Sequence, residues 1–297
     1  MPSIGNGIGT TFRSSAFGGG GGAGPSVNYP ADLYPNMSFA YGFTKAAFAY
    51  SGPCMQVQRS SDGEYMEVGW INNYYADLQS ILDWAGTDTV RVTIIYDTTG
   101  NGNNAYMNTE AQQCRIADAG SLTLYNKGLR YYWNGQRQRY NITNATNSPY
   151  NKSRLDTYLL HTRATSNNLG MPIGILNISI NGGFVLLSQS STQLPYYNVG
   201  TPTYYLNGNG ISWPTRTSVF NSLPTGNLDQ ISILGARTNT VISNSVLVIG
   251  SSIDFGFIFI GAMQTHWGWT VDTSADREAI EALINETYTF DPLNPFP

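Results

Sequence analysis

Short segments in which apolar and polar residues alternate constrain the fold of this chain more than any other feature. They recur between turn sequences from residue 39 onward, at 54–59, 89–96, 174–180, 184–187, 231–234, 245–249 and 255–260. A period of two places successive side chains on opposite faces of a strand, and sequences such as Asn-Gly or Ser-Asp-Gly between strands favour tight turns. The pattern therefore predicts an all-β fold, an antiparallel sandwich.

Two further segments have the spacing of amphipathic helices. One covers residues 76–84, and the other covers 274–284, where a serine cap and a following glutamate mark the start of a helix. We expect the second helix to close the domain. The chain shows no repeat with a period of roughly 20–50 residues, which argues against a repeat array.

The first 37 residues differ from the rest of the chain. Five consecutive glycines occupy positions 18–22, and a glycine run loses much backbone entropy on ordering. We expect residues 1–37 to form a flexible arm and residues 38–297 to form one domain. Spaced apolar residues in the arm are candidates for anchoring it to a partner: Ile4, Ile8, Phe12 and Phe17. The alternative is a terminus without a partner.

Composition limits the partners and the compartment. Charged residues make up only 11% of the chain and the formal net charge is -4, so no basic surface is expected to bind nucleic acid. The sequence has neither a signal-peptide pattern nor an apolar run of about 18 residues that could span a membrane. Cys54 and Cys114 could form one disulfide, but two buried reduced thiols are the simpler interpretation.

Several motifs resemble one domain type when they are taken in order. They are residues 40–43, 50–53, 57–63, the turn at 95–104, and residues 276–281 with Asn285 and Tyr288. The first four resemble the concanavalin-like jelly roll of the fungal arabinofuranosidase B catalytic module, a domain type that recurs in bacteriophage and bacterial surface proteins. The last resembles the closing helix of laminin-G-type domains. The resemblance implies a jelly-roll β-sandwich with a short C-terminal helix, and it hardly covers residues 131–229.

The catalytic pattern of that family is not recognisable here. The resemblance implies a Glu nucleophile and an Asp acid in the middle and later parts of the domain, together with a disulfide between adjacent cysteines. Retaining glycosidases need two carboxylates about 5–5.5 Å apart, yet Asp156 is the one carboxylate between Asp118 and Asp229, and no Cys-Cys pair is present. Asp229 and Asp254 remain, without a Glu at the expected position. We therefore expect no catalytic residues and no enzymatic activity.

Two sets of residues are candidates for binding. His266, Trp267 and Trp269 could stack on a sugar, although a packed aromatic strand end is the favoured interpretation. Oxygen atoms of Asp97, Asn101 and Asn104 could hold Ca²⁺ or a carbohydrate, although hydrogen bonding within a sharp turn explains the same residues. His161 and His266 are the two histidines of the chain and cannot form a three-histidine metal site, so we expect neither a metal nor another cofactor.

These observations lead to one main hypothesis and two alternatives. We expect a non-enzymatic structural component of a bacteriophage virion, such as a head-fibre, tail-fibre or capsid-decorating protein. Its arm would contact other virion proteins, and its jelly roll would be displayed as a homo-oligomer. The first alternative is a glycan-binding module for host surface polysaccharide. The second is an arabinofuranosidase-like glycosidase.

Overall fold

A computed structural model describes residues 28–125, 128–129, 131–134, 139–142, 154–163, 173–176, 182–183, 201–223, 229–236, 246–250 and 260–288. The glycine run, the four candidate anchors Ile4, Ile8, Phe12 and Phe17, and Asp254 lie outside the described residues. The expectations placed on them therefore stay predictions.

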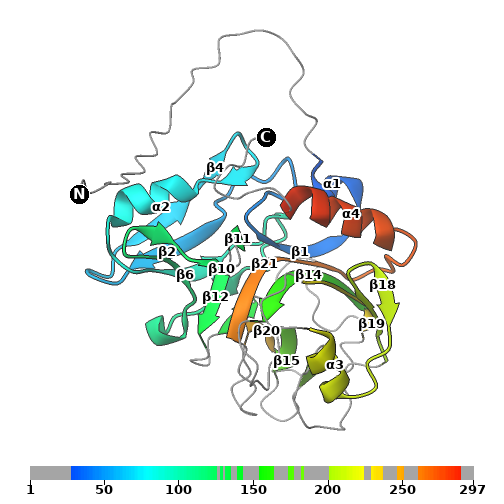
Figure 1. Ribbon diagram of the computed structural model, residues 1–297. Helices are drawn as coiled ribbons and strands as arrows, with labels where there is room; N and C mark the ends of the chain where they lie inside the picture. The colour runs from blue at the N-terminus through cyan, green and yellow to red at the C-terminus, as the bar shows by residue number, and fades with distance from the viewer. Residues whose placement is uncertain are drawn as a thin grey trace, which may run out of the picture.

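Strands dominate the described part of the chain (Figure 1). The longer ones are β1 (Met37–Gly42), β2 (Met55–Arg59), β3 (Tyr65–Val68), β6 (Val90–Ile95), β8 (Arg115–Asp118), β12 (Tyr131–Asn134), β13 (Arg139–Ile142), β14 (Leu155–Arg163), β15 (Ile173–Leu176), β17 (Thr203–Leu206), β19 (Asp229–Ala236), β20 (Val246–Gly250) and β21 (Ile260–Trp269). Short strands are β4 (Trp70–Ile71), β5 (Tyr75–Ala76), β7 (Ala105–Tyr106), β9 (Ser121–Leu122), β10 (Leu124–Tyr125), β11 (Gly128–Leu129), β16 (Gly182–Gly183) and β18 (Asn209–Ile211). The helices are α1 (Pro30–Leu33), α2 (Leu78–Ala85), α3 (Arg216–Ser222) and α4 (Arg277–Tyr288), with a 3₁₀ turn at Glu110–Gln112. The all-β prediction is confirmed.

The strands pair antiparallel in two series. In the first series, β18 pairs with β17, followed by β19, β14, β21 and β1. In the second series, β3 pairs with β2, followed by β6, β7, β13, β20 and β15. Strand β12 joins the two series because it pairs with β21 of the first and with β8, which in turn pairs with β6 of the second. The result is the sandwich expected from the alternating segments.

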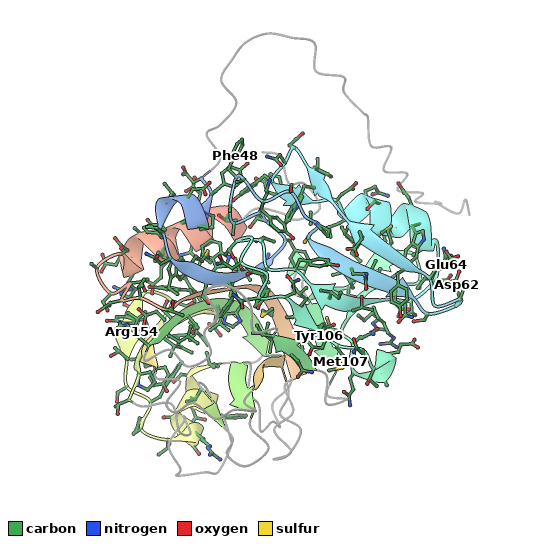
Figure 2. All side chains as sticks on the ribbon, turned by 180° about the vertical axis from the view of Figure 1, so that it is seen from behind. Phe48, Asp62, Glu64, Tyr106, Met107 and Arg154 are labelled. Carbon is green, nitrogen blue, oxygen red and sulfur yellow. The ribbon has the colours of Figure 1, made fainter. Side chains whose placement is uncertain are left out.

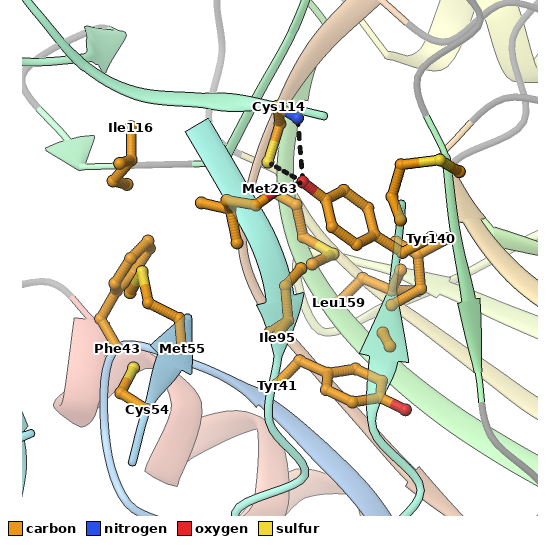
Figure 3. Packing of buried hydrophobic residues seen from close by; sticks show 14 of the residues in the cluster. Tyr41, Phe43, Cys54, Met55, Ile95, Cys114, Ile116, Tyr140, Leu159 and Met263 are labelled. Carbon is orange, nitrogen blue, oxygen red and sulfur yellow. Dashed lines mark hydrogen bonds between the residues drawn. The ribbon is translucent and has the colours of Figure 1, made fainter. Parts of the chain in front are cut away.

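The main hydrophobic core fills the space between these series. Figure 3 shows Tyr41 of β1, Met55 of β2, Leu159 of β14 and Met263 of β21 in this cluster. Tyr140 of β13 is also buried there, and its hydroxyl lies 2.9 Å from the backbone nitrogen of Cys114. Strands of both series therefore contribute side chains to one cluster.

A second cluster lies on the other face of β14 and β21. Ile280, Leu283 and Ile284 have helical spacing along α4, and they pack in one cluster with Trp267 and Trp269 of β21. Figure 1 shows α4 lying beside α1 over this part of the sheet. The predicted closing helix is therefore confirmed, and it covers the outer face of the sheet.

The other local expectations agree with the structure in most respects. The predicted helix at 76–84 corresponds to α2, whose first turn is capped by the Asp77 side chain, which accepts a hydrogen bond from the Ser80 backbone. Cys54 and Cys114 are buried and are not disulfide-bonded, as the simpler interpretation predicted.

Among the described helices, none is long and apolar enough to cross a lipid bilayer.

The last residues assigned to the arm pack onto the domain. The Tyr29 ring contacts the rings of Phe48 and Tyr74, each at a centroid distance of 5.5 Å. The Ala31 backbone nitrogen donates to Ala46, and the indole nitrogen of Trp269 donates to the Tyr34 carbonyl oxygen. These contacts place residues 29–34 in the folded domain, several residues before the expected boundary at residue 38.

Candidate functional site

The side chain of Asp97 organises the turn that the sequence offered as a calcium site. Asp97 is 1% exposed, and its Oδ1 accepts the backbone N–H groups of Ala40 at 3.0 Å and Thr99 at 3.1 Å. Its Oδ2 accepts the backbone N–H of Asn103 at 3.0 Å. Burial raises the pKa of Asp97, and these hydrogen bonds oppose that rise. Because the carboxylate is surrounded by hydrogen-bond donors, a cation would meet the positive ends of their dipoles.

The asparagines of the same turn also have structural partners. Asn101 Nδ2 donates to the carbonyl oxygens of Met37 at 2.8 Å and Ser38 at 3.2 Å. Asn104 Oδ1 accepts the backbone N–H of Asp97 at 2.9 Å. Within the described residues, no group of three or more His, Cys, Asp or Glu side chains is arranged to hold a metal ion. Hydrogen bonding within the turn therefore accounts for all three candidate residues.

The aromatic candidates on β21 are buried. His266 is 0% exposed, Trp267 1% and Trp269 0%. The two tryptophans pack under α4, whereas the His266 ring contacts Phe39 and Tyr41. None of the three presents a ring face to solvent, so the packed strand end, and not a sugar-stacking surface, agrees with the structure.

Asp156 is a buried carboxylate with a structural role. Its oxygens accept hydrogen bonds from the Arg154 side chain at 2.9 Å, the Gly235 backbone at 2.7 Å and the Thr273 backbone at 2.8 Å. Figure 2 shows Arg154 at the side of the molecule away from Asp62 and Glu64. Both oxygens of Asp156 are therefore engaged in joining β14 to β19 and to the segment before α4.

Glu281 of α4 is engaged in the same way. Its Oε1 accepts the Ser232 hydroxyl at 2.6 Å, and its Oε2 forms an ion pair with Arg277. The Arg277 guanidinium lies 4.0 Å from the centre of the Tyr205 ring. This network attaches α4 to β17 and β19, and it leaves Glu281 without an oxygen directed at a substrate.

Asp229, at the start of β19, is different. It is 4% exposed, and its Oδ1 accepts a hydrogen bond from Asn207 Nδ2 at 3.1 Å. Its Oδ2 has no hydrogen-bond partner among the described residues. The next side chain, Gln230, bonds the backbone of α4, so strand alternation directs Asp229 to the inner face with Ile231. An unsatisfied buried carboxylate oxygen is costly, and a catalytic role is one explanation for such a group.

A surface hollow was not predicted from the sequence. It has a volume of about 480 Å³ and is lined by residues from two segments, Ser51, Gly52, Pro53, Glu67, Gly69, Trp70 and Asn73. We call it the Trp70 hollow. An aromatic residue followed two positions later by paired turn asparagines, Trp70 to Asn73, is the one local signal that could have indicated it.

The family comparison and the solved structures agree on one type of fold. The family described as "Alpha-L-arabinofuranosidase B, catalytic" matches residues 29–167. A solved GH54 α-L-arabinofuranosidase soaked with a cyclic sulfate inhibitor has a TM-score of 0.53 and 16% sequence identity. That likeness covers 86% of this chain and 65% of the solved chain. The fold is therefore an arabinofuranosidase-like jelly roll.

Particular relatives agree with this class. The chain is 35% identical over 83 residues to an arabinofuranosidase/B-xylosidase of Trichoderma koningii and to an α-L-arabinofuranosidase of Hypocrea jecorina. These 83 residues are 28% of this chain and 16% of each relative. A solved arabinofuranosidase complexed with arabinofuranosyl-α-1,2-xylobiose has a TM-score of 0.53 and 15% identity, over 86% of this chain and 64% of the other. The chain thus spans only part of the length of the relatives that it matches.

These comparisons correct the main functional hypothesis. They lead to glycosidases, so the expectations of a bacteriophage structural protein, of a virion location and of a non-enzymatic role are wrong. The non-enzymatic expectation depended on the missing pair of carboxylates at recognisable positions in the sequence. A fold brings catalytic side chains together from distant segments, so linear spacing is a weak criterion for their absence.

Proposed function

We propose that this domain is a glycoside hydrolase that removes α-L-arabinofuranosyl groups from glycans. The family match over residues 29–167 and the likeness in fold over 86% of the chain support this class of reaction. Among the described residues, the observation that carries the proposal is the buried carboxylate of Asp229 with one unpartnered oxygen.

Asp229 is buried and keeps one carboxylate oxygen without a partner among the described residues, so we consider it for the role of catalytic acid. In glycoside hydrolysis a carboxylic acid protonates the departing oxygen, while a second carboxylate attacks the sugar or activates water. Asn207 holds Oδ1 of Asp229 at 3.1 Å and fixes the orientation of the carboxyl group. The other oxygen, Oδ2, remains for proton transfer. We assign the acid role to Asp229, and Asp254, the other carboxylate retained from the sequence, is the candidate for the second role.

The test compares two substrates that differ in their leaving groups. The protein is expected to release nitrophenol from 4-nitrophenyl α-L-arabinofuranoside and arabinose from arabinofuranosyl-α-1,2-xylobiose. Loss of an acid costs about 10²–10⁴-fold in rate. For Asp229→Asn we expect a loss of this size on the oligosaccharide and a much smaller one on the nitrophenyl substrate, because nitrophenolate leaves without protonation.

Two further carboxylate variants are compared with Asp229→Asn. Asp83→Asn alters an exposed carboxylate on α2 and should leave both rates unchanged. Asp254→Asn should lower both rates together, as expected for the second carboxylate. Equal losses on both substrates for Asp229→Asn would move Asp229 to that second role. A folded protein that releases sugar from neither substrate would refute the proposed hydrolysis.

One observation favours a second candidate, glycan binding without hydrolysis. The hydrogen-bond partner of Asp229 among the described residues is the amide of Asn207 and not another carboxylate. If calorimetry shows binding of arabinofuranosyl-α-1,2-xylobiose while no arabinose is released over long incubation, this second function replaces the first.

A further inference from the structure

The Trp70 hollow lies apart from Asp229 on the folded domain. Strand β4, which carries Trp70, is at the top of Figure 1, and β19, which begins with Asp229, is at the lower right. A ligand in the hollow would therefore not occupy the candidate hydrolytic site.

We propose that the Trp70 hollow is a second carbohydrate site, which holds a neutral sugar unit of a glycan chain. This inference goes beyond hydrolysis and stands on different residues. Three features of the hollow carry it: a fixed aromatic side chain, a fixed hydrogen-bond acceptor and a fixed hydrogen-bond donor.

The aromatic side chain is that of Trp70. Its indole nitrogen donates to the Gly52 carbonyl oxygen at 2.7 Å, which fixes the ring against the loop before β2. The Tyr50 hydroxyl donates to the Pro53 carbonyl oxygen at 2.8 Å and braces the same loop. An added Cβ atom at Gly69, which also lines the hollow, would meet no atom within 4 Å apart from those of its two chain neighbours, so the hollow is open at this position. Sugars present C–H groups that pack on such aromatic surfaces.

The acceptor is the exposed carboxylate of Glu67. Its Oε1 accepts hydrogen bonds from Gln56 Nε2 and from the Tyr96 hydroxyl, each at 2.9 Å. These two donors fix the orientation of the carboxylate on β3. The second oxygen, Oε2, is left to accept from hydroxyl groups of a ligand. A binding group held in place before the ligand arrives loses less entropy on binding.

The donor is the side-chain amide of Asn73. Lys45 is 2% exposed, and its ammonium donates to Asn73 Oδ1 at 2.7 Å. An ammonium group can only donate hydrogen bonds. The amide oxygen of Asn73 must therefore face Lys45, and the amide nitrogen must point elsewhere. Asn73 lines the hollow and has a φ of 59°, a conformation that asparagine tolerates well. The Tyr29 hydroxyl is another neighbour of this side chain, and because the amide nitrogen carries two N–H groups, we assign one of them as a donor to the hollow.

The charges at the hollow select among sugars. A carboxylate acceptor and an amide donor beside an indole match the hydroxyl groups and the C–H face of an uncharged sugar. Glu67 would repel a uronic acid or a phosphate, because like charges in a partly desolvated site are unfavourable. The expected ligand is therefore a neutral oligosaccharide.

Xylohexaose, a neutral oligosaccharide, is the probe for calorimetric titration of the full chain. We expect binding by the wild-type protein and roughly tenfold weaker binding for Trp70→Ala, since aromatic packing contributes on that scale. Trp70 also packs against the main core, so a second variant avoids a folding defect. Gly69→Leu fills the open space without backbone strain and should weaken binding to a similar degree. Asn73→Asp, which keeps the Lys45 contact and removes the donor, should also weaken it.

Two controls alter comparable residues elsewhere. Gly210→Leu changes an exposed glycine on β18, and Glu278→Gln changes an exposed carboxylate on α4. Both should bind xylohexaose as the wild-type protein does, and so should Asp229→Asn. Wild-type protein that binds no xylohexaose, Gly69→Leu that binds it unchanged, or equal binding of an oligogalacturonate would each overturn the proposal.

The outcomes separate this proposal from that of hydrolysis. Gly69→Leu should keep the wild-type rate on 4-nitrophenyl α-L-arabinofuranoside, because that small substrate needs no second site. Binding of xylohexaose, together with no release of arabinose from arabinofuranosyl-α-1,2-xylobiose, would refute hydrolysis and support the second site. Hydrolysis without binding of xylohexaose would support the hydrolase and refute the second site.

Discussion

At the scale of single residues, His266 gives the protein a built-in sensitivity to acid. It is fully buried, both ring nitrogens lack hydrogen-bond partners among the described residues, and the Phe39 ring lies 4.9 Å from its own. Burial lowers the pKa of His266 to about 3. The imidazole is therefore neutral in the folded protein, and the charged form is strongly disfavoured.

The pKa of His266 sets the direction of the pH dependence. In the unfolded chain a histidine titrates near pH 6.5, so as the pH falls below about 6.5 the unfolded state takes up the proton first. Above that pH, His266 does not reduce the free energy of unfolding. Below it, the free energy of unfolding decreases by up to about 1.4 kcal/mol per pH unit until about pH 3. In His266→Leu the free energy of unfolding should depend on pH much less steeply than in the wild-type protein. Urea unfolding at several pH values between pH 7 and pH 4 measures this dependence. Identical slopes for the two proteins would contradict this account.

At the scale of elements, the turn at 97–104 connects two parts of the sandwich. Asp97 accepts the backbone N–H of Ala40, and Asn101 donates to Met37 and Ser38, so a turn between β6 and β7 is bound to β1. Asp97→Asn keeps the size of the side chain but removes the charge that its N–H donors face. We expect a loss of about 2 kcal/mol in the free energy of unfolding, since buried hydrogen bonds to charged groups contribute on that order.

A metal test accompanies this substitution. The exposed Asp83→Asn should leave the unfolding free energy within about 0.5 kcal/mol of the wild-type value. Addition of a calcium chelator should not change the melting temperature of the wild-type protein, because the Asp97 oxygens already accept N–H groups. A clear decrease in melting temperature with the chelator would restore the calcium hypothesis for this turn.

The elements also show where sequence patterns succeed. The alternating segments predicted β2, β6, β19 and β20, and helical spacing predicted α2 and α4. The alternating segments missed the central strand β14 and most of β21, of which they reached only the first residue, Ile260. Residues on both of their faces are buried, in one cluster between the strand series and in another under α4. A strand buried on both faces loses the period-two signal on which the prediction depended.

At the scale of the whole molecule, the sequence contained the residues of both candidate sites but not their arrangement. Asp229 was retained as a carboxylate, yet its burial with one unpartnered oxygen comes from the packing of β19 on its neighbours. The amide orientation of Asn73 depends on Lys45, which lies 28 positions earlier in the chain. Neither property follows from local pattern, because each depends on contacts between segments. The same reason explains why the scarcity of carboxylates suggested a non-enzyme.

The start of the domain can be tested by shortening the chain. The expected boundary at residue 38 would leave α1 outside, whereas Tyr29, Ala31 and Tyr34 contact the domain and the family match begins at residue 29. A chain that starts at Asn28 should therefore melt within about 1 °C of the full chain. A chain that starts at Ser38 loses the packing of α1 and of Met37, which we place at about 3 kcal/mol or more. Its melting temperature should fall by roughly 5–10 °C in a calorimetric scan. Equal melting temperatures for the two shortened chains would show that α1 does not stabilise the domain, as expected for a part of the arm.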